Sequence, residues 1–255
     1  MISLRDVSKT FPGARQAAVQ SLSFDVPRHS LTVLLGASGS GKTTTLKLIN
    51  RLETPSAGVI RLDGTDTRTL DPVALRRRCG YVVQGIGLFP HLTVGDNIGL
   101  LPRTLGWSTA RCKARVAELL NLVQLPAAEF AHRYPDELSG GQQQRVGVAR
   151  ALATEPAVLL MDEPFGALDP ATRSLLQTEL KRLQAGLELT IVMVTHDVTE
   201  ALTLADQIIV FAAGQSVFAG TPAELLASPV PAVQALLAAP RQQLAALQEL
   251  QSASA

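Results

Sequence analysis

The chain has 255 residues, of which 46% are hydrophobic, and a formal net charge of +1. This length and apolar content suffice for a buried core, while a charge this close to zero gives no overall field that would favour nucleic acid as a partner. No apolar run approaches the roughly 18 residues of a membrane-spanning helix, and Arg5, Asp6 and Lys9 interrupt any segment that resembles a signal peptide. Cys79 and Cys112 form no C-x-x-C pair, so we expect reduced, partly buried thiols. These features predict a cytoplasmic protein that binds no nucleic acid.

The first predicted elements are short strands. Apolar residues alternate within 2–25 and within 58–63, and Pro or Gly residues bound both stretches. Such alternation is typical of strands with one buried face. We therefore expect a small antiparallel sheet that flanks the ligand-binding site.

A glycine-rich segment follows the short apolar run 31–35 and ends in Gly41, Lys42 and Thr43. It fits the pattern G-x-x-x-x-G-K-[ST], in which backbone N–H groups and the lysine bind nucleotide phosphates while the hydroxyl binds Mg²⁺. Residues 43–52 lack Gly and Pro and predict the helix that this loop requires, whose N-terminal N–H groups attract phosphate. An ordinary glycine-rich turn would need neither the strand nor the helix. The predicted phosphate-binding residues are Gly36, Ala37, Ser38, Gly39, Ser40, Gly41, Lys42, Thr43 and Thr44.

The middle of the chain predicts one strand followed by helices. The basic run 76–78 precedes a predicted strand at 81–83, and we interpret this run as a solvated face at the start of that strand. Apolar residues at helical spacing predict a helix over 108–124, and a second helix is predicted over 139–153. We therefore expect a helical subdomain inserted at about 88–153.

Strands alternate with helices in the second half of the chain. Strands are predicted at 158–161, 191–194 and 208–211, with helices at 171–184 and 198–205 between them. Short links between such elements imply a parallel sheet with right-handed crossovers. The fold class is therefore α/β.

Two carboxylates and a histidine follow these strands directly. Asp162 and Glu163 end the run 158–161, at the carboxyl edge where parallel sheets bind ligands. Because adjacent strand residues point to opposite sides, we expect one carboxylate to hold Mg²⁺ and the other to accept a proton from an attacking water. His196 takes the corresponding place after 191–194. Without the phosphate loop, a solvated strand end would be a competing explanation for the two carboxylates, and a lone histidine is usually a structural hydrogen-bonding residue.

A second glycine-rich element at 138–142 completes a pattern that resembles the ATP-binding subunits of ABC transporters. It reads Leu-Ser-Gly-Gly-Gln, and Asp162, Glu163 and Pro164 follow it in the expected order. The resemblance covers the chain up to about residue 231. It implies a P-loop NTPase (RecA-like) core with a parallel sheet, an N-terminal antiparallel β subdomain and an inserted α-helical subdomain. We expect one ATP-binding domain at 1–230 and a short helical tail at 231–255, which either packs on the surface or contacts a partner.

The element at 138–142 predicts an anion site that has no lysine of its own. Ser139 suits the N-cap of the helix that follows, and Gly140 and Gly141 allow close approach of the backbone. A merely capped helix start would explain Ser139 but not two glycines followed by Gln142. The resemblance implies a head-to-tail homodimer, in which Ser139 and Gly141 of one copy close over the γ-phosphate that Lys42 of the other copy holds.

The resemblance also implies roles for single residues. Phe11 would stack on adenine, where Tyr is commoner in the family, although stacking needs only an aromatic face. Gln84 belongs to the Q-loop, His196 is the switch histidine, and the D-loop is formed by Ala167, Leu168 and Asp169.

These roles give a site for ATP and Mg²⁺. Thr43, Gln84 and Asp162 would hold Mg²⁺, and Lys42 would neutralise charge on the β- and γ-phosphates. Glu163 would orient or deprotonate the attacking water, and His196 would contact the γ-phosphate. The set of nucleotide-binding residues is completed by the signature and D-loop residues Ser139, Gly140, Gly141, Gln142 and Asp169.

The segment 76–91 resembles the Q-loop region of importers for osmoprotectants such as glycine betaine and choline. The resemblance implies integral membrane permease subunits, an extracytoplasmic substrate-binding protein, and a place on the inner face of the cell membrane. A quaternary amine needs an aromatic cage, and one Trp and two Tyr are too few for one here, so other subunits would recognise the cargo. Import of an amino acid or a polyamine, export, and a soluble ABC-type ATPase of DNA repair or translation remain as alternatives.

Overall fold

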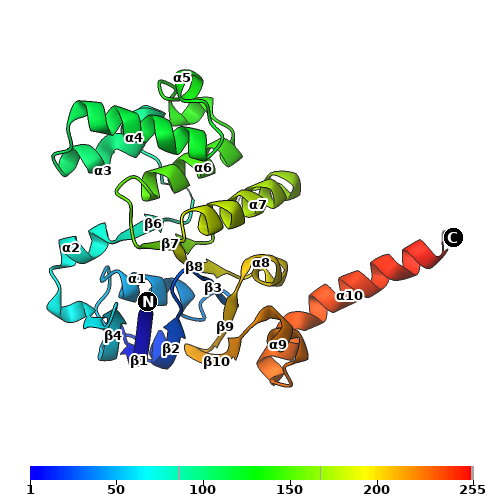
Figure 1. The fold of residues 1–255 in the computed structure, drawn as a ribbon. Coiled ribbons are helices and arrows are strands. Elements are labelled where there is room, and N and C mark those ends of the chain that lie inside the picture. The colour runs from blue at the N-terminus through cyan, green and yellow to red at the C-terminus, as the bar shows by residue number, and fades with distance from the viewer. Residues whose placement is uncertain (86, 167, 254–255) are drawn as a thin grey trace. The chain divides into compact units, whose positions relative to one another are not determined.

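The computed structural model describes residues 1–85, 87–166 and 168–253. It divides into two compact units, which are described separately: unit 1 comprises Met1–Asp66 and Val194–Ala255, and unit 2 comprises Thr67–Met193 (Figure 1). Within the described ranges, no helix has both the length and the apolar character to cross a membrane.

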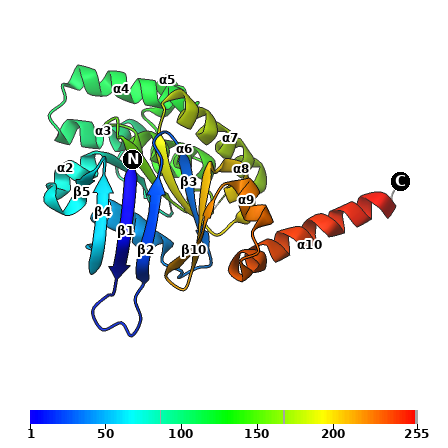
Figure 2. The ribbon, with the colours of Figure 1, turned by 60° about the horizontal axis from the view of Figure 1, so that its bottom comes forward.

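Unit 1 begins with the expected antiparallel sheet. Its strand order is β2-β1-β4-β5, formed by β1 (Ile2–Lys9), β2 (Val19–Val26), β4 (Ala57–Leu62) and the two-residue β5 (Thr65–Asp66). Ile2 pairs with Val26 on one side and with Leu62 on the other, and all three side chains are buried. The hairpin at 10–18 joins β1 to β2 and projects beyond both strands (Figure 2).

The second sheet region of unit 1 carries the phosphate loop. β3 (Leu31–Gly36) pairs in parallel with β9 (Gln207–Ala212), which pairs in antiparallel fashion with β10 (Gln215–Gly220). Every residue of β3 is buried. This strand leads into α1 (Lys42–Ile49), which ends earlier than the predicted 43–52 because Arg51 adopts a left-handed φ of 53°.

Short helices and a long one complete unit 1. They are α8 (Val198–Leu204), α9 (Pro222–Ala227) and α10 (Pro231–Ala253). α10 lies where a helical tail was expected, whereas β10 and α9 were not predicted. β10 lacks a clear buried face, since its residues are exposed or half-buried, and α9 is only six residues long.

Unit 2 combines a parallel pair of strands with a cluster of helices. β6 (Cys79–Val82) runs parallel to β7 (Val158–Asp162), and β8 (Thr190–Thr195), inside which the boundary between the units falls, follows β7 in the strand order. The helices are α2 (Pro72–Arg77), α3 (Val94–Thr104), α4 (Thr109–Leu122), α5 (Ala127–Phe130), α6 (Gly140–Ala151) and α7 (Pro170–Gly186). Helices α3 to α6 pack against one another and form the expected helical subdomain (Figure 1).

Two details of unit 2 differ from the prediction. The strand expected at 81–83 begins two residues earlier and ends one residue earlier, as Cys79–Val82, and the basic residues before it do not begin a strand. Arg76 and Arg77 are exposed on the last turn of α2, where cations suit the negative end of the helix dipole.

Both cysteines are buried free thiols, with Cys79 8% and Cys112 4% exposed.

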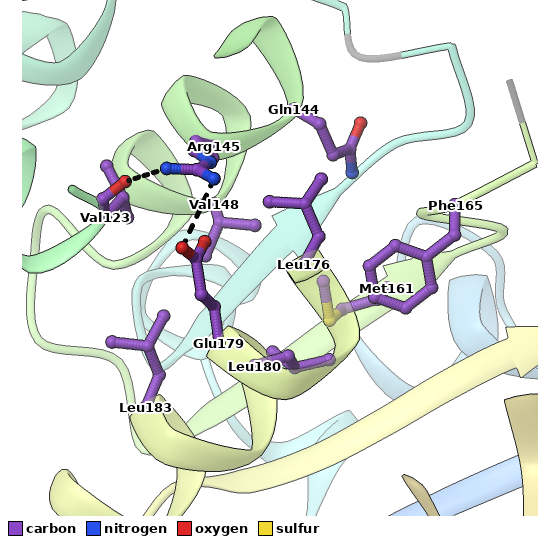
Figure 3. A pocket seen from close by; sticks show the side chains of 10 residues that line it. All are labelled: Val123, Gln144, Arg145, Val148, Met161, Phe165, Leu176, Glu179, Leu180 and Leu183. Atoms are coloured by element: carbon purple, nitrogen blue, oxygen red, sulfur yellow. Dashed lines mark hydrogen bonds and ion pairs between the residues drawn. The ribbon is translucent and has the colours of Figure 1, made fainter. Parts of the chain in front are cut away.

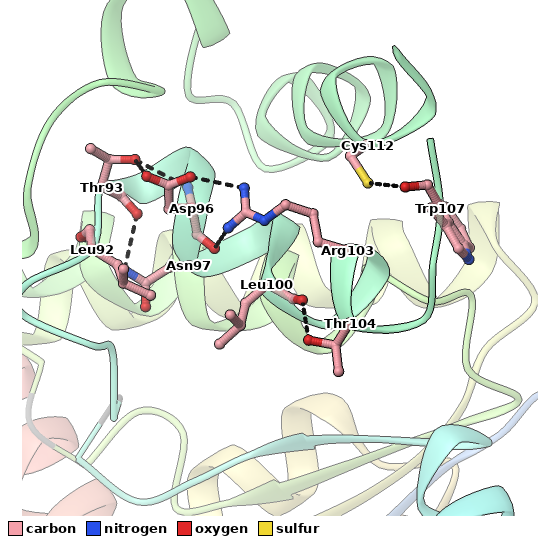
Figure 4. A network of polar contacts seen from close by, with 9 residues as sticks. All are labelled: Leu92, Thr93, Asp96, Asn97, Leu100, Arg103, Thr104, Trp107 and Cys112. Carbon is pink, nitrogen blue, oxygen red and sulfur yellow. Dashed lines mark hydrogen bonds and ion pairs between the residues drawn. The ribbon is translucent and has the colours of Figure 1, made fainter. Parts of the chain in front are cut away.

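Helix α3 was missed because Gly95, Gly99 and Pro102 obscure its apolar spacing. Its position is fixed instead by Asn97, which is fully buried. The Asn97 amide nitrogen donates to the carbonyl oxygens of Phe89, Leu92 and Thr93 at 3.1, 3.1 and 3.0 Å. Its side-chain oxygen accepts from the Phe89 N–H at 2.8 Å. Figure 4 shows the part of this network in which Asn97 contacts Leu92 and Thr93, just before α3.

We expect Asn97→Ala to lower the free energy of unfolding by about 3 kcal/mol, because it leaves the Phe89 N–H and nearby carbonyls without their partner. Urea denaturation monitored by circular dichroism measures the change. Asn121→Ala, on the exposed face of α4, is the matched control and should stay within about 0.5 kcal/mol. Equal stability of the two variants would contradict the structural role of Asn97.

Candidate nucleotide-binding site

The phosphate loop of unit 1 has the backbone that its sequence predicts. Gly41 is the N-cap of α1 and has a left-handed φ of 103°. A Cβ atom at Gly41 would lie 2.5 Å from the Ala18 carbonyl oxygen, so a larger residue cannot enter without moving the backbone. The described first turn of α1 carries no acidic side chain. The positive end of the helix is therefore available to an anion.

Lys42 lies inside this loop with its charge buried. The residue is 4% exposed. Its ammonium donates to the carbonyl oxygens of Gly36 and Ala37, at 2.7 Å each, and to the Ser40 hydroxyl at 3.4 Å. The loop thus brings Gly36, Ala37 and Ser40 together around one cation, which these dipoles stabilise.

Two further predicted residues belong to unit 1. His196 is exposed and lies between β8 and α8, where Asp197 caps α8 by accepting from the Thr199 and Glu200 N–H groups. Phe11 lies in the hairpin at 10–18, and 36% of the residue is exposed. An exposed aromatic ring on a short hairpin can take a planar ligand on its face.

Unit 2 holds the two carboxylates and Gln84. Asp162 is the last residue of the fully buried strand β7 and is 4% exposed. Glu163 follows it with a left-handed φ of 46°. The expectation that strand alternation separates the two carboxylates is therefore wrong, because Glu163 has left the strand. The turn directs Glu163 toward Gln84, whose amide nitrogen donates to Glu163 Oε2 at 3.1 Å. Left-handed backbone at a non-glycine residue costs free energy and is often found at functional sites.

Tyr81 is a residue at this site that sequence reasoning missed. It pairs with Leu160 in β7, two residues before Asp162. Burial raises the pKa of the Tyr81 phenol well above its usual range, and the negative charge of Asp162 raises it further. The signal in the sequence was a polar side chain on the strand next to the one that carries Asp162. A phenol with this pKa stays protonated and can donate a hydrogen bond.

The element at 138–142 forms a capped helix start in unit 2. Ser139 Oγ accepts from the Gln142 N–H at 3.3 Å, and Gln142 Oε1 accepts from the Ser139 N–H at 2.9 Å. This reciprocal capping box explains Gln142 as well as Ser139, contrary to our expectation that a simple cap leaves Gln142 unexplained. The capping box does not explain the two glycines between them.

Gly141 packs tightly on the first turn of α7. A Cβ atom at Gly141 would lie 2.4 Å from Thr172 Cγ2, closer than any normal contact. Asp169 caps α7 by accepting from the Ala171 and Thr172 N–H groups at 3.1 and 3.0 Å, and the hydrogen bonds from Thr172 lower the pKa of the Asp169 carboxyl. Ala167, predicted with Asp169 in the D-loop, lies outside the described residues. The starts of α6 and α7 thus lie side by side.

An ion pair joins the same two helices further along. Arg145 on α6 lies 3.2 Å from Glu179 on α7, and both side chains are largely buried (Figure 3). Arg145 also donates to the Val123 carbonyl oxygen at 3.3 Å. The pair borders an apolar cavity of about 20 Å³, which has room for one water molecule. Burial raises the pKa of Glu179, and the positive charges of Arg145 and Arg182 oppose this shift.

Comparison with known proteins agrees with this geometry. The profile of the ABC transporter family matches residues 19–166. The osmoprotectant import ATP-binding protein OsmV of Salmonella typhimurium is 52% identical over 232 residues, which are 90% of this chain and 61% of that protein. The glycine betaine/carnitine/choline transport ATP-binding protein OpuCA of Bacillus subtilis is 53% identical over 229 residues, which are 90% of this chain and 60% of that protein. The chain therefore spans about three fifths of the length of these relatives.

A solved structure shows the same fold. It is a dimeric post-hydrolysis state of the ATP-binding cassette MJ0796 bound to ADP and Pi, with a TM-score of 0.77 and 33% identity. The match covers 87% of this chain and 99% of that one.

We expect Gly141→Ala to destabilise the protein by about 1–3 kcal/mol, because the new methyl group overlaps Thr172 Cγ2. Adding Thr172→Ser removes that methyl group and should restore most of the lost stability. Thermal unfolding of the two single variants and the double variant measures both effects. A double variant no more stable than Gly141→Ala alone would show that another contact requires the glycine.

Proposed function

Because the chain belongs to the ABC transporter family, we propose that it binds and hydrolyses ATP and so drives import of a small solute. The observation that carries this proposal is the placement of Glu163, which a left-handed turn removes from β7 and which Gln84 contacts at 3.1 Å. A carboxylate held by a hydrogen-bond donor beside the end of a buried strand suits a general base. The phosphate loop around Lys42 would provide the nucleotide site.

ATP would bind through the phosphate loop. The Lys42 ammonium donates hydrogen bonds to the Gly36 and Ala37 carbonyl oxygens. Phosphate oxygens would accept these hydrogen bonds instead, so the buried charge of Lys42 would stay paired. Backbone N–H groups at residues 37–44 and the N-terminus of α1 would surround the phosphates. Phe11 would stack on adenine.

Thr43, Gln84 and Asp162 are the residues that would hold Mg²⁺, because each carries a side-chain oxygen and Mg²⁺ prefers oxygen ligands. Gln84 donates to Glu163 through its amide nitrogen, so its carbonyl oxygen is the atom for a cation. Mg²⁺, when bound, supplies positive charge to the phosphate oxygens. Glu163 would accept the proton of the attacking water, Lys42 would stabilise charge on the γ-phosphate, and His196 would donate a hydrogen bond to it.

A second copy would complete the site. Ser139 and Gly141 at the start of α6 would close over the γ-phosphate bound to Lys42 of the partner copy. The dimeric state of the similar ATP-binding cassette MJ0796 supports this arrangement. Dimer closure with ATP and opening after hydrolysis would form the two-state element that moves the permease.

Quaternary amines such as glycine betaine and choline are the cargo we propose. Both curated relatives carry names of osmoprotectant or glycine betaine, carnitine and choline transport. Integral membrane permease subunits and an extracytoplasmic substrate-binding protein would be the partners, and the chain would lie on the inner face of the membrane. Import of an amino acid or a polyamine is the second candidate, because the ATP site itself carries no information about cargo.

Phe89 and His91 are the proposed contacts to the permease. Phe89 is 41% exposed, and its ring centroid lies 6.0 Å from that of His91. Asn97 fixes the backbone at Phe89, and Arg150 lies 5.8 Å from the Phe89 ring. A rigid, exposed aromatic pair that follows Gln84 can report the state of the nucleotide to a partner.

Glu163→Gln is expected to keep ATP binding but to lower hydrolysis about 10²–10⁴-fold, because the amide cannot accept the proton. Lys42→Ala should instead weaken binding of the nucleotide itself. Phosphate release and equilibrium binding of a fluorescent ATP analogue separate the two effects, and sedimentation of Glu163→Gln with ATP should reveal a dimer. Near-normal turnover in Glu163→Gln would remove Glu163 from the mechanism, and a persistent monomer would remove the shared site.

In proteoliposomes with the permease, a binding protein loaded with glycine betaine or choline should stimulate ATP hydrolysis, whereas the free amine should not affect the isolated chain. Phe89→Ala or His91→Ala should reduce transport while basal hydrolysis persists. Tyr134→Ala, an exposed aromatic of the same unit, is the control. Stimulation by an amino-acid-loaded binding protein alone would overturn the cargo assignment but leave the ATPase assignment intact.

A further inference from the structure

A lysine lies directly behind the aromatic ring of the hairpin at 10–18. Lys9 is the last residue of β1, and its ammonium lies over the Phe11 ring at 4.9 Å from the centroid. This distance is within the range of a cation–π interaction. The Lys9 side chain is 12% exposed, so water screens the contact less than on an open surface.

Two groups hold the Lys9 ammonium in this place. It lies 2.8 Å from Glu53 Oε2 and donates to the Thr54 carbonyl oxygen at 2.9 Å. Both residues belong to the segment that leaves α1, and the Glu53 N–H donates to the Lys47 carbonyl oxygen of α1 at 3.0 Å. Lys9 therefore connects the Phe11 ring to the far end of the helix whose N-terminus carries the phosphate loop.

The backbone beside Phe11 is held to the same region. The Thr10 N–H donates to Ser56 Oγ at 3.1 Å, and the Ser56 N–H donates to the Ser8 carbonyl oxygen at 2.8 Å. The Ala14 N–H closes a turn on the Phe11 carbonyl oxygen at 3.0 Å. Phe11 nevertheless stays 36% exposed as a residue. The backbone at Phe11 is thus fixed by hydrogen bonds, and its ring is in contact with the Lys9 ammonium.

We propose that Lys9 is a positioning residue for the base of the bound nucleotide. It fixes the Phe11 ring relative to α1, so that the aromatic face and the phosphate loop are set at the separation that a nucleotide spans. Its charge on one face of Phe11 also draws π-electron density away from the opposite face, which favours stacking of an electron-rich purine there. This inference rests on the proposed binding of ATP.

Binding of ADP and of inorganic tripolyphosphate tests the proposal, because only ADP has a base. Lys9→Met, which keeps the length of the side chain without its charge, should weaken ADP binding about 3- to 10-fold, using a tenfold change per 1.4 kcal/mol. Tripolyphosphate binding should not change. Lys9→Arg should restore ADP affinity, and the KM for ATP hydrolysis should rise in Lys9→Met more than kcat falls.

Arg5→Met is the matched control. Arg5 lies on the same strand and forms a more exposed ion pair with Asp25 at 2.7 Å, so its loss removes an ion pair of β1 without touching Phe11. Calorimetric titration with ADP and with tripolyphosphate should give wild-type affinities for Arg5→Met. Phe11→Ala should weaken ADP binding as Lys9→Met does, and combining the two substitutions should add little, because they remove one shared interaction.

The outcomes separate the inference from the function on which it rests. If Lys9→Met weakened the binding of tripolyphosphate and the binding of ADP equally, Lys9 would act through α1. This result would overturn the proposal. Additive effects of Lys9→Met and Phe11→Ala, or no effect of either on ADP, would overturn it while ATP binding by the wild-type chain stands. Failure of the wild-type chain to bind ADP would overturn the proposed function itself.

Discussion

A buried ammonium group determines how the chain must run between β3 and α1. Removing the charge of Lys42 from water would cost several kcal/mol if it were unpaired, so the loop curls until the Gly36 and Ala37 carbonyls face the ammonium. That curl is possible only with the left-handed backbone of Gly41. It also needs rigid supports, which the fully buried strand β3 and the helix α1 provide. The strand, the loop and the helix thus meet around one buried charge.

In unit 2, helices α6 and α7 are held together by close packing at their first turns and by an ion pair further along. The first turns of α6 and α7 approach so closely that Gly141 has no room for a side chain beside Thr172. Further along, Arg145 and Glu179 connect the same helices by a largely buried ion pair. The two helix starts, capped by Ser139 and Asp169, are thus held together as one block. Any ligand or partner that contacts one helix start acts on the other as well.

The sequence predicted the parts of the fold that have strong periodicity or a constrained spacing. The glycine-lysine spacing identified the phosphate loop, and the apolar runs identified β3, β7 and β9. Helix α3 was not predicted, because Gly95, Gly99 and Pro102 obscure its apolar spacing and its position depends on hydrogen bonds of Asn97 to the segment just before it. The backbone turn at Glu163 also depends on tertiary context, since glutamate has no preference for left-handed φ. The capping box of Ser139 and Gln142 was visible in the sequence as S-x-x-Q, and its local role was overlooked.

The two buried cysteines have a practical consequence for spectroscopy. Burial raises the pKa of the Cys79 thiol to about 12, so at neutral pH almost none of it is the thiolate that alkylating reagents attack. Cys112 is 4% exposed, and its thiol donates to the Trp107 carbonyl oxygen at 3.7 Å. A maleimide dye or a nitroxide should therefore react selectively with a cysteine introduced at an exposed position. Distances between the two units could then be followed by resonance energy transfer in a chain that keeps both of its native cysteines.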